Sequence, residues 1–197
     1  MAQYARPDSD VSASNWTGSY TAIDESSYDD ADRLLGADNA NGTTEKGLSD
    51  VTDPAASSGH VVRFRAWQEN NSHQRTLSVV LVQGSTVIST YAAFNLVKGT
   101  ATSYSWTLSS AEADAITDYT DLRLRFKSDG TVSTPPSSRS EVYVSWAELE
   151  VPDSTLKLVA GTLTSGDGTV AGAALDLTYP ASALSAGGAL ADRKSVV

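Results

Sequence analysis

Apolar and polar side chains alternate in several short segments of this 197-residue chain. Residues 122–126, for example, read Leu-Arg-Leu-Arg-Phe. A two-residue period places the apolar side chains on one face of a β-strand and the arginines on the opposite face. The same alternation recurs at residues 60–67, 76–82, 104–108 and 142–146. The pattern therefore predicts a series of strands, each with one face in a hydrophobic core.

Turn signals separate these strands. Gly84 lies in a Gln-Gly-Ser-Thr segment and predicts the turn of a β-hairpin between residues 76–82 and 87–91. The polar residues 69–74 predict a second hairpin loop. Many short strands with closely spaced turns are typical of an antiparallel sandwich or jelly roll.

A single short helix is expected after residues 104–108. Ser109 and Glu112 have the spacing of a capping box, in which each side chain accepts a hydrogen bond from a free backbone N–H of the first turn. The helix is expected to end near Ile116.

The two ends of the chain differ from its centre. Residues 1–58 lack sustained alternation and predict an irregular, acidic region, with short strands allowed at Val11, Trp16 and Tyr20 to Ile23. An acidic loop is expected at 24–32 and a Gly/Asn-rich connection at 36–47. We therefore predict an all-β fold. It consists of an antiparallel two-sheet jelly-roll sandwich over residues 1–152 and a small β-rich C-terminal appendage over residues 153–197.

The appendage is poor in bulky residues. Residues 156–158 and 175–179 are strand-like, and Ser165 to Gly168 predicts a turn. Two or three strands need a partner surface to be stable. We expect this segment to dock on a partner or a second copy. The alternative is a hairpin packed on its own sandwich.

The apolar register also predicts the core of the sandwich. The side chains expected inside are Val62, Phe64, Leu77, Val79, Leu81, Trp106, Leu122, Leu124, Phe126, Val142, Val144 and Trp146.

Composition narrows the functional classes. The net charge is −10 and the pI is about 4.5, which argues against nucleic-acid binding and against an anionic membrane surface. No apolar run approaches the roughly 18 residues of a spanning helix. The chain has no cysteine, so a disulfide or a thiolate nucleophile is excluded. Its first residues lack the apolar core of an export signal, so synthesis in a cytoplasm is expected.

The sequence contains no recognisable catalytic set. Its two histidines, His60 and His73, lie outside any Gly-x-Ser-x-Gly setting, and both are expected to be solvated loop residues. Carboxylates are so abundant that no glycosidase-type pair stands out. We therefore predict a protein that is not an enzyme and uses no cofactor.

The acidic loops are candidate sites for a structural calcium ion. The candidate ligands are the pairs Asp8/Asp10 and Asp50/Asp53 and the acidic run at 24–32, because calcium prefers several carboxylate and carbonyl oxygens. No EF-hand pattern is present. The alternative is that these loops are simply solvated.

Aromatic side chains on the outer strand faces are candidates for sugar contacts, and the basic side chains there are candidates for surface ion pairs. Trp67 falls on the arginine face of its strand and is the first candidate for stacking on a sugar, followed by Tyr91 and Tyr143. The alternative for Trp67 is burial beneath a loop. The outward arginines are expected to pair with acidic loops of the same chain or of a neighbour: Arg63, Arg65, Arg123 and Arg125.

Seven segments, taken in order, resemble a jelly-roll module that recurs in structural proteins of tailed bacteriophages and in related bacterial surface proteins. They are Tyr-Ala-Arg-Pro-Asp-Ser-Asp-Val at 4–11, Trp-Thr at 16–17, Asp-Asp-Ala-Asp at 29–32, Gly-Leu-Ser-Asp-Val-Thr-Asp-Pro at 47–54, Gly-His-Val-Val-Arg-Phe-Arg at 59–65, the run 108–126, and Val-Tyr-Val-Ser-Trp-Ala-Glu-Leu-Glu-Val-Pro at 142–152.

The resemblance implies a non-enzymatic sandwich on a virion surface, in a capsid decoration or cement protein, a head fibre or a tail appendage. Its expected partners are phage capsid or tail proteins and copies of itself, with a trimer as the expected oligomer. Such modules also resemble carbohydrate-binding domains in outline. The alternative function is therefore a module that recognises a host-surface or other polysaccharide. The resemblance covers residues 4–152 and carries no catalytic residues.

Overall fold

The computed structural model describes residues 2–37, 40–70, 73–130, 140–153, 159–165 and 168–174. The chain forms two compact units, residues 1–155 and residues 156–197. Within the described residues, no helix is long and apolar enough to cross a membrane.

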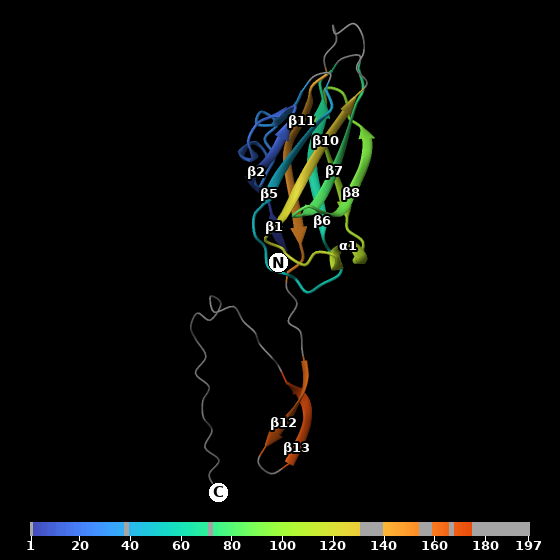
Figure 1. Ribbon diagram of the computed structural model, residues 1–197. Helices are drawn as coiled ribbons and strands as arrows, with labels where there is room; N and C mark the ends of the chain where they lie inside the picture. The colour runs from blue at the N-terminus through green and yellow to red at the C-terminus, as the bar shows by residue number, and fades with distance from the viewer. Residues whose placement is uncertain are drawn as a thin grey trace. The chain divides into compact units, whose positions relative to one another are not determined.

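The first unit consists of two antiparallel β-sheets packed face to face (Figure 1). Sheet A has the strand order β3-β4-β11-β6-β9, and β1 also pairs with β11. Its strands are β1 (Gln3–Ala5), β3 (Trp16–Thr17), β4 (Leu34–Gly36), β6 (Val61–Gln68), β9 (Thr102–Thr107) and β11 (Val142–Val151). The predicted antiparallel two-sheet fold is confirmed.

Sheet B has the strand order β2-β5-β10-β7-β8. Its strands are β2 (Pro7–Ser14), β5 (Gly42–Leu48), β7 (Arg75–Gln83), β8 (Thr86–Asn95) and β10 (Leu122–Gly130). The 3-10 helix η1 (Tyr20–Ala22) lies between β3 and β4 in the chain. The helix α1 (Ser110–Asp114) follows β9, and it lies toward the same end of the sandwich as β1 in Figure 1.

Ten of the twelve predicted core side chains are buried between the two sheets. Trp106 is only partly buried, because it lies on β9 at the edge of sheet A, although it packs against the core. Its indole Nε1 donates to Ser89 Oγ of β8 at 3.0 Å. Together with Phe94 and Tyr104, it closes the side of the sandwich between the edge strands β8 and β9.

The prediction for Trp146 is wrong. The register between β11 and β6 shifts between Val144 and Trp146, so β11 contains a bulge at Ser145. A bulge inserts one residue and moves every later side chain to the opposite face. Ala147 and Leu149 are therefore the inward residues, both fully buried, and Trp146 lies half-buried on the outer face.

Residues 1–58 are more regular than the sequence predicted, because they supply β1 to β5. Val11 and Trp16 lie on strands as expected, but Tyr20–Ala22 forms η1, and much of the expected connection at 36–47 belongs to β5.

The polar strand β5 pairs with β2 on one side and with β10 on the other. Its Lys46 lies opposite the core residue Leu124 and is only 1% exposed. The ammonium pairs with Asp10 and donates to the Gly18 carbonyl at 3.0 Å. A buried lysine is tolerated here because its charge is paired and hydrogen-bonded.

The segment at 69–74 was predicted to be a hairpin loop, and that prediction is wrong. Strand β6 belongs to sheet A and β7 to sheet B, so the connection crosses between the sheets. The buried Gln68 side chain joins the strand ends. It donates to Ser140 Oγ at 3.0 Å and accepts from the Arg75 backbone N–H at 2.7 Å.

Two local predictions are confirmed. Strands β7 and β8 form the expected hairpin, with Gly84 at φ +57°, in the left-handed region that favours glycine. Ser109 and Glu112 form both hydrogen bonds of the capping box. The helix ends at Asp114, slightly before the expected Ile116.

The second unit contains an antiparallel pair of strands, β12 (Val159–Ser165) and β13 (Gly168–Ala174). Leu163 lies opposite Val170, and Ser165 lies opposite Gly168, at the place where the sequence predicted a turn. The strand-like segments predicted at 156–158 and 175–179 lie outside the described residues.

Candidate functional site

Two of the predicted sugar-stacking residues are neighbours. Trp67 of β6 and Tyr143 of β11 lie opposite each other on the outer face of sheet A, with ring centroids 5.1 Å apart. The Arg33 guanidinium covers both rings, at 5.8 Å from Trp67 and 4.6 Å from Tyr143. The two residues are therefore only 8% and 9% exposed. For Trp67 the structure shows burial beneath a connecting segment, which was the alternative.

The hydroxyl of Tyr143 is also engaged. It donates to Glu141 Oε2 at 2.8 Å. Burial, together with the neighbouring Glu141 carboxylate, raises the pKa of Tyr143 to about 12. The phenol is neutral across the physiological pH range and its proton is committed to a carboxylate.

The third predicted residue, Tyr91, lies elsewhere. It is on β8 of sheet B and faces the core, where its ring packs at 5.6 Å from Phe64 and 5.4 Å from Trp106. The structure therefore does not bring Trp67, Tyr91 and Tyr143 together into one aromatic surface.

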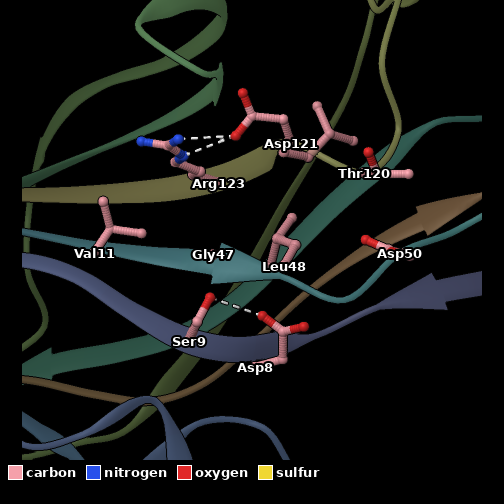
Figure 2. Close-up of a pocket in the computed structure, with 10 residues that line it drawn as sticks. Asp8, Ser9, Val11, Gly47, Leu48, Asp50, Thr120, Asp121 and Arg123 are labelled. Atoms are coloured by element: carbon pink, nitrogen blue, oxygen red, sulfur yellow. Dashed lines mark hydrogen bonds and ion pairs between the residues drawn. The ribbon is translucent and has the colours of Figure 1, made fainter.

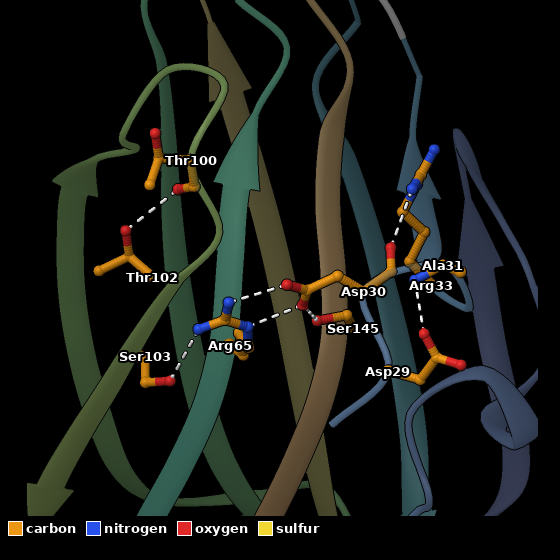
Figure 3. Close-up of polar contacts among 9 residues, drawn as sticks. All are labelled: Asp29, Asp30, Ala31, Arg33, Arg65, Thr100, Thr102, Ser103 and Ser145. Carbon is orange, nitrogen blue, oxygen red and sulfur yellow. Dashed lines mark hydrogen bonds and ion pairs between the residues drawn. The ribbon is translucent and has the colours of Figure 1, made fainter. Parts of the chain in front are cut away.

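The acidic run at 24–32 is packed onto the outer face of sheet A. Figure 3 shows Asp30 between Arg65 of β6 and Ser145 of β11. Arg65 donates to both Asp30 oxygens, at 2.7 and 2.8 Å, and the Ser145 hydroxyl donates to Asp30 at 2.8 Å. These hydrogen bonds, the Arg65 bond first, lower the pKa of Asp30.

The same segment covers the aromatic residues of this face. The Tyr28 ring lies 4.2 Å from the Arg65 guanidinium, and the Trp146 indole donates to the Glu25 carbonyl at 2.9 Å. Glu148, further along β11, accepts from Arg6 and Arg63. Over β6 and β11, the outer face of sheet A is therefore covered by contacts within the chain, whereas Ser103 and Ser105 of β9 remain exposed.

The four outward arginines pair with acidic residues of the same chain, as one of the two alternatives predicted. Arg63 pairs with Glu148 and Glu150, and Arg65 with Asp30. On sheet B, Glu45 lies between Arg123 and Arg125, at 3.3 and 2.7 Å.

His60 is not a solvated loop residue, and that prediction is wrong. It is fully buried, and its Nε2 lies 2.8 Å from the Tyr119 hydroxyl. Burial lowers the pKa of His60. Burial thus disfavours the charged imidazolium, and the ring links the start of β6 to the segment that precedes β10. The second histidine, His73, accepts a hydrogen bond at its backbone carbonyl from Ser140.

The residues considered for calcium fall in different surroundings. Asp10 accepts hydrogen bonds from Ser19 Oγ and the Tyr20 backbone N–H and pairs with Lys46, which lower its pKa against the opposing effect of burial. The part of the chain that the structure describes contains no group of three or more His, Cys, Asp or Glu side chains that could hold a metal ion.

The outer face of sheet B carries a hollow of about 230 Å³. Its lining comes from β2, the end of β5, the start of β10 and the adjoining loops: Asp8, Ser9, Val11, Gly47, Leu48, Asp50, Thr120, Asp121, Leu122 and Arg123. Figure 2 shows Asp121 and Arg123 on one side of the end of β5, and Asp8 and Ser9 on the other.

A glycine forms the floor of this hollow. Gly47 lies opposite Ser9 of β2 and Arg123 of β10, so all three positions belong to the outer face. A Cβ atom at position 47 would collide with Ser9 Oγ. The hollow exists because β5 has no side chain at this point.

The donors of the hollow are already committed. Ser9 donates to Asp8 Oδ1 at 2.9 Å, and Thr120 donates to Asp118 Oδ1 at 2.7 Å. Arg123 donates from Nε and Nη2 to Asp121 Oδ1, at 3.2 and 2.8 Å, and from Nη1 to Glu45 at 3.3 Å. The Asp121 bond is the main cause that raises the pKa of Arg123.

The acceptors of the hollow are mostly free. Within the described residues, no side chain donates to or pairs with the Asp50 carboxylate, and the second oxygens of Asp8 and Asp121 likewise accept no hydrogen bond. Sequence reasoning noticed Asp8 and Asp50 only as possible calcium ligands. It identified Arg123 only as an outward arginine that pairs with acidic residues, and it missed Gly47 and Ser9, because nothing in the sequence shows that β2, β5 and β10 are adjacent.

Comparisons with known proteins give only distant similarity. No protein-family model matches the chain, and no curated protein matches it. A solved structure of TmCBM61 in complex with beta-1,4-galactotriose is 6% identical, with a TM-score of 0.35, over 59% of this chain and 68% of that chain. A family 16 carbohydrate-binding module is 8% identical, with a TM-score of 0.35, over 65% of this chain and 82% of that one. The enzymatically active domain of bacteriophage CBA120 tailspike protein 4 is 10% identical, with a TM-score of 0.32, over 74% of this chain and 18% of that one.

Proposed function

We propose that this chain is a non-catalytic carbohydrate-binding module, and that the hollow on the outer face of sheet B holds one sugar residue. The observation that carries this proposal is a small concave site with free carboxylate oxygens on an otherwise open sheet face. A sugar ring presents several hydroxyl donors, and a carboxylate can accept hydrogen bonds at both of its oxygens. A few polar groups in a concave site are sufficient to fix the orientation of a ligand.

The hollow also offers apolar contact for the C–H groups of a sugar ring. Val11 of the lining is 43% exposed, whereas Leu48 and Leu122 belong to the core beneath it. The bare backbone at Gly47 lets a ligand approach the sheet closely. One apolar patch and several polar groups together suit a ligand that has both kinds of surface.

Two features support the absence of catalysis. The carboxylates of Asp8 and Asp50 are exposed, whereas a general acid is usually tuned by burial in a water-poor cleft. His60 is buried and bonded to Tyr119. The proposed module acts by binding alone.

The test is a binding screen by isothermal titration calorimetry against neutral oligosaccharides, with a pair of matched variants. Asp8→Asn with Asp50→Asn changes the hollow, and Asp32→Asn with Asp114→Asn removes the same charge at two exposed aspartates outside its lining. We expect the first variant to bind more weakly than the wild type and the second to bind with unchanged affinity. Absence of binding to every carbohydrate in the screen would contradict the proposed function.

A second candidate function is a structural component displayed on a phage particle. One observation favours it. Gln3 of β1 pairs with Val151 at the end of β11, so the start of the sandwich and the strand that leads to the second unit lie at one end. Attachment through that end would leave both outer faces free for display.

This second function predicts stoichiometric copies of the chain on the surface of purified virions, together with capsid or tail proteins. Mass spectrometry of purified particles is the direct measurement. Deleting residues 156–197 should abolish incorporation. Incorporation at normal occupancy would show that docking lies elsewhere.

A further inference from the structure

We infer that the hollow on sheet B selects an amino sugar, whose ammonium group replaces a hydroxyl, over the corresponding neutral and carboxylated sugars. This inference rests on the proposed function, since it names the class of sugar that the same site prefers.

The charges that line the hollow are unbalanced. Asp8, Asp50 and Asp121 contribute three carboxylates, and Arg123 contributes the single guanidinium of the lining. The Arg123 guanidinium cannot bind a further anion without losing a hydrogen bond, because each of its three nitrogens already donates to Asp121 or Glu45. The hollow therefore has a net negative charge with no uncommitted cation.

The lining also offers a ligand more uncommitted hydrogen-bond acceptors than uncommitted donors. Each hydroxyl of the lining donates to an aspartate, Ser9 to Asp8 and Thr120 to Asp118. In the described part of the chain, the Asp50 carboxylate accepts no hydrogen bond, and neither do the second oxygens of Asp8 and Asp121. A ligand must therefore supply donors, and it finds acceptors.

An ammonium group meets both requirements, because it carries a positive charge and three donors and no acceptor. A neutral sugar hydroxyl meets only the second requirement. A uronic acid meets neither, because its carboxylate would have to displace Asp121 or Glu45 from Arg123 before it found a cation. The expected order of affinity is amino sugar, then neutral sugar, then uronic acid.

A bare metal ion is a poorer match than an ammonium group. Calcium needs six to eight oxygen ligands gathered around one point. The carboxylates of the hollow belong to β2, the segment after β5 and the segment before β10, and they do not form a group that could hold a metal within the described residues. An ammonium group needs fewer ligands, because a charge-assisted hydrogen bond to a single carboxylate already pairs its charge.

The experiment compares ligands that differ at one substituent. Oligomers of β-1,4-linked glucosamine, N-acetylglucosamine, glucose and glucuronic acid are titrated calorimetrically at low salt and at a pH where the amine is protonated. We expect the glucosamine oligomer to bind roughly tenfold more tightly than the glucose oligomer, since exposed charge pairs contribute modestly. The N-acetylated oligomer should lose that preference, and added salt should remove it.

Matched variants separate the hollow from the overall charge of −10. The Asp8→Asn/Asp50→Asn variant should bind glucosamine and glucose oligomers equally. The Asp32→Asn/Asp114→Asn variant has the same net charge and should keep the preference. Thermal melting of both variants checks that they remain folded. A preference that falls equally in both variants would overturn the inference, because it would report the overall charge only.

The remaining outcomes distinguish the inference from the proposed function. If the glucose and glucosamine oligomers bind equally and both depend on Asp8 and Asp50, the function stands and the inference is wrong. Tightest binding of the glucuronic acid oligomer would also make the inference wrong. If no oligomer binds, both the inference and the proposed function are wrong.

Discussion

The two outer faces of the sandwich have the same alternating strand pattern, but the face of sheet A is covered by another segment and the face of sheet B contains a hollow. Sheet A presents Arg63, Arg65 and Trp67 outward, and sheet B presents Arg123 and Arg125. On sheet A, a segment that precedes β4 in the chain supplies carboxylates and rings that cover this surface. On sheet B, glycine and serine positions of β5 and β2 leave a hollow beside the arginines.

This contrast shows that the outward position of an aromatic or basic residue does not by itself predict contact with a ligand. Trp67 has the position expected of a sugar platform, yet Arg33 covers it. Gly47 has no chemistry of its own, yet it opens the site. What a strand face can bind depends on which distant segments lie over it.

The largest loss of stability is expected from a substitution on the inner face of sheet A, which can be compared with one on its outer face. Phe64→Ala removes a fully buried ring and should lower the free energy of unfolding by about 3–5 kcal/mol. Trp146→Ala should cost only about 1–2 kcal/mol, because this ring is half-buried on the outer face. Urea unfolding measures both values. Equal losses would mean that Trp146 belongs to the core, as the sequence alone predicted.

Asp30→Ala tests the closure of sheet A. It removes the partner of Arg65 and Ser145, and should cost about 1–2 kcal/mol because the carboxylate is partly exposed. Its control is Asp32→Ala, at an exposed position, which should change stability little. We also expect Trp146 fluorescence to shift toward that of a solvated indole. An unchanged spectrum would indicate that the covering segment is held by other contacts.

The contribution of Asp30 should also depend on pH in one direction. Its pKa is lower in the folded chain than the ordinary value of 3.8. The carboxylate therefore stabilises the fold fully above that ordinary value, and this contribution is lost as the pH falls through the lowered folded value. The stability difference between the wild type and Asp30→Asn should shrink in acid. A difference that grows in acid would contradict the assignment.

Gly47→Ala tests the openness of sheet B. The added Cβ collides with Ser9 Oγ, so the serine must leave its rotamer and its bond to Asp8, at a cost of about 1 kcal/mol. Adding Ser9→Ala should restore stability, because the serine Cβ is at an ordinary contact distance of 3.5 Å. A double-mutant cycle measures this coupling. Additive costs would show that the two residues do not interact.

Deleting residues 156–197 should have the smallest effect on the sandwich. These residues form a separate compact unit, so the melting temperature of the remainder should be nearly unchanged. The resemblance to phage appendages implies a trimer, and we expect the C-terminal residues 153–197 to make inter-subunit or particle contacts. Analytical ultracentrifugation of both forms measures whether self-association is lost. Unfolding of the truncated chain would assign the segment to the sandwich core.

The strands in the central part of the chain, the β7–β8 hairpin and the capping box at Ser109 could all be predicted from local sequence. Each of these follows from a local period or a local hydrogen bond, which nearby residues specify completely. The same reasoning identified the inward residues of β10 as Leu122, Leu124 and Phe126, because the alternation of apolar and charged side chains is complete within these five positions.

The features that involve segments distant in sequence depend on how the whole chain packs. Lys46 enters the interior because Asp10 neutralises its charge and the Gly18 carbonyl accepts a hydrogen bond from it, and the bulge in β11 turns Trp146 outward. The candidate site needs Ser9, Gly47 and Arg123 side by side, although they come from three separate strands. A period of two residues states which face a side chain takes, but only the packing of the whole chain determines what meets that face.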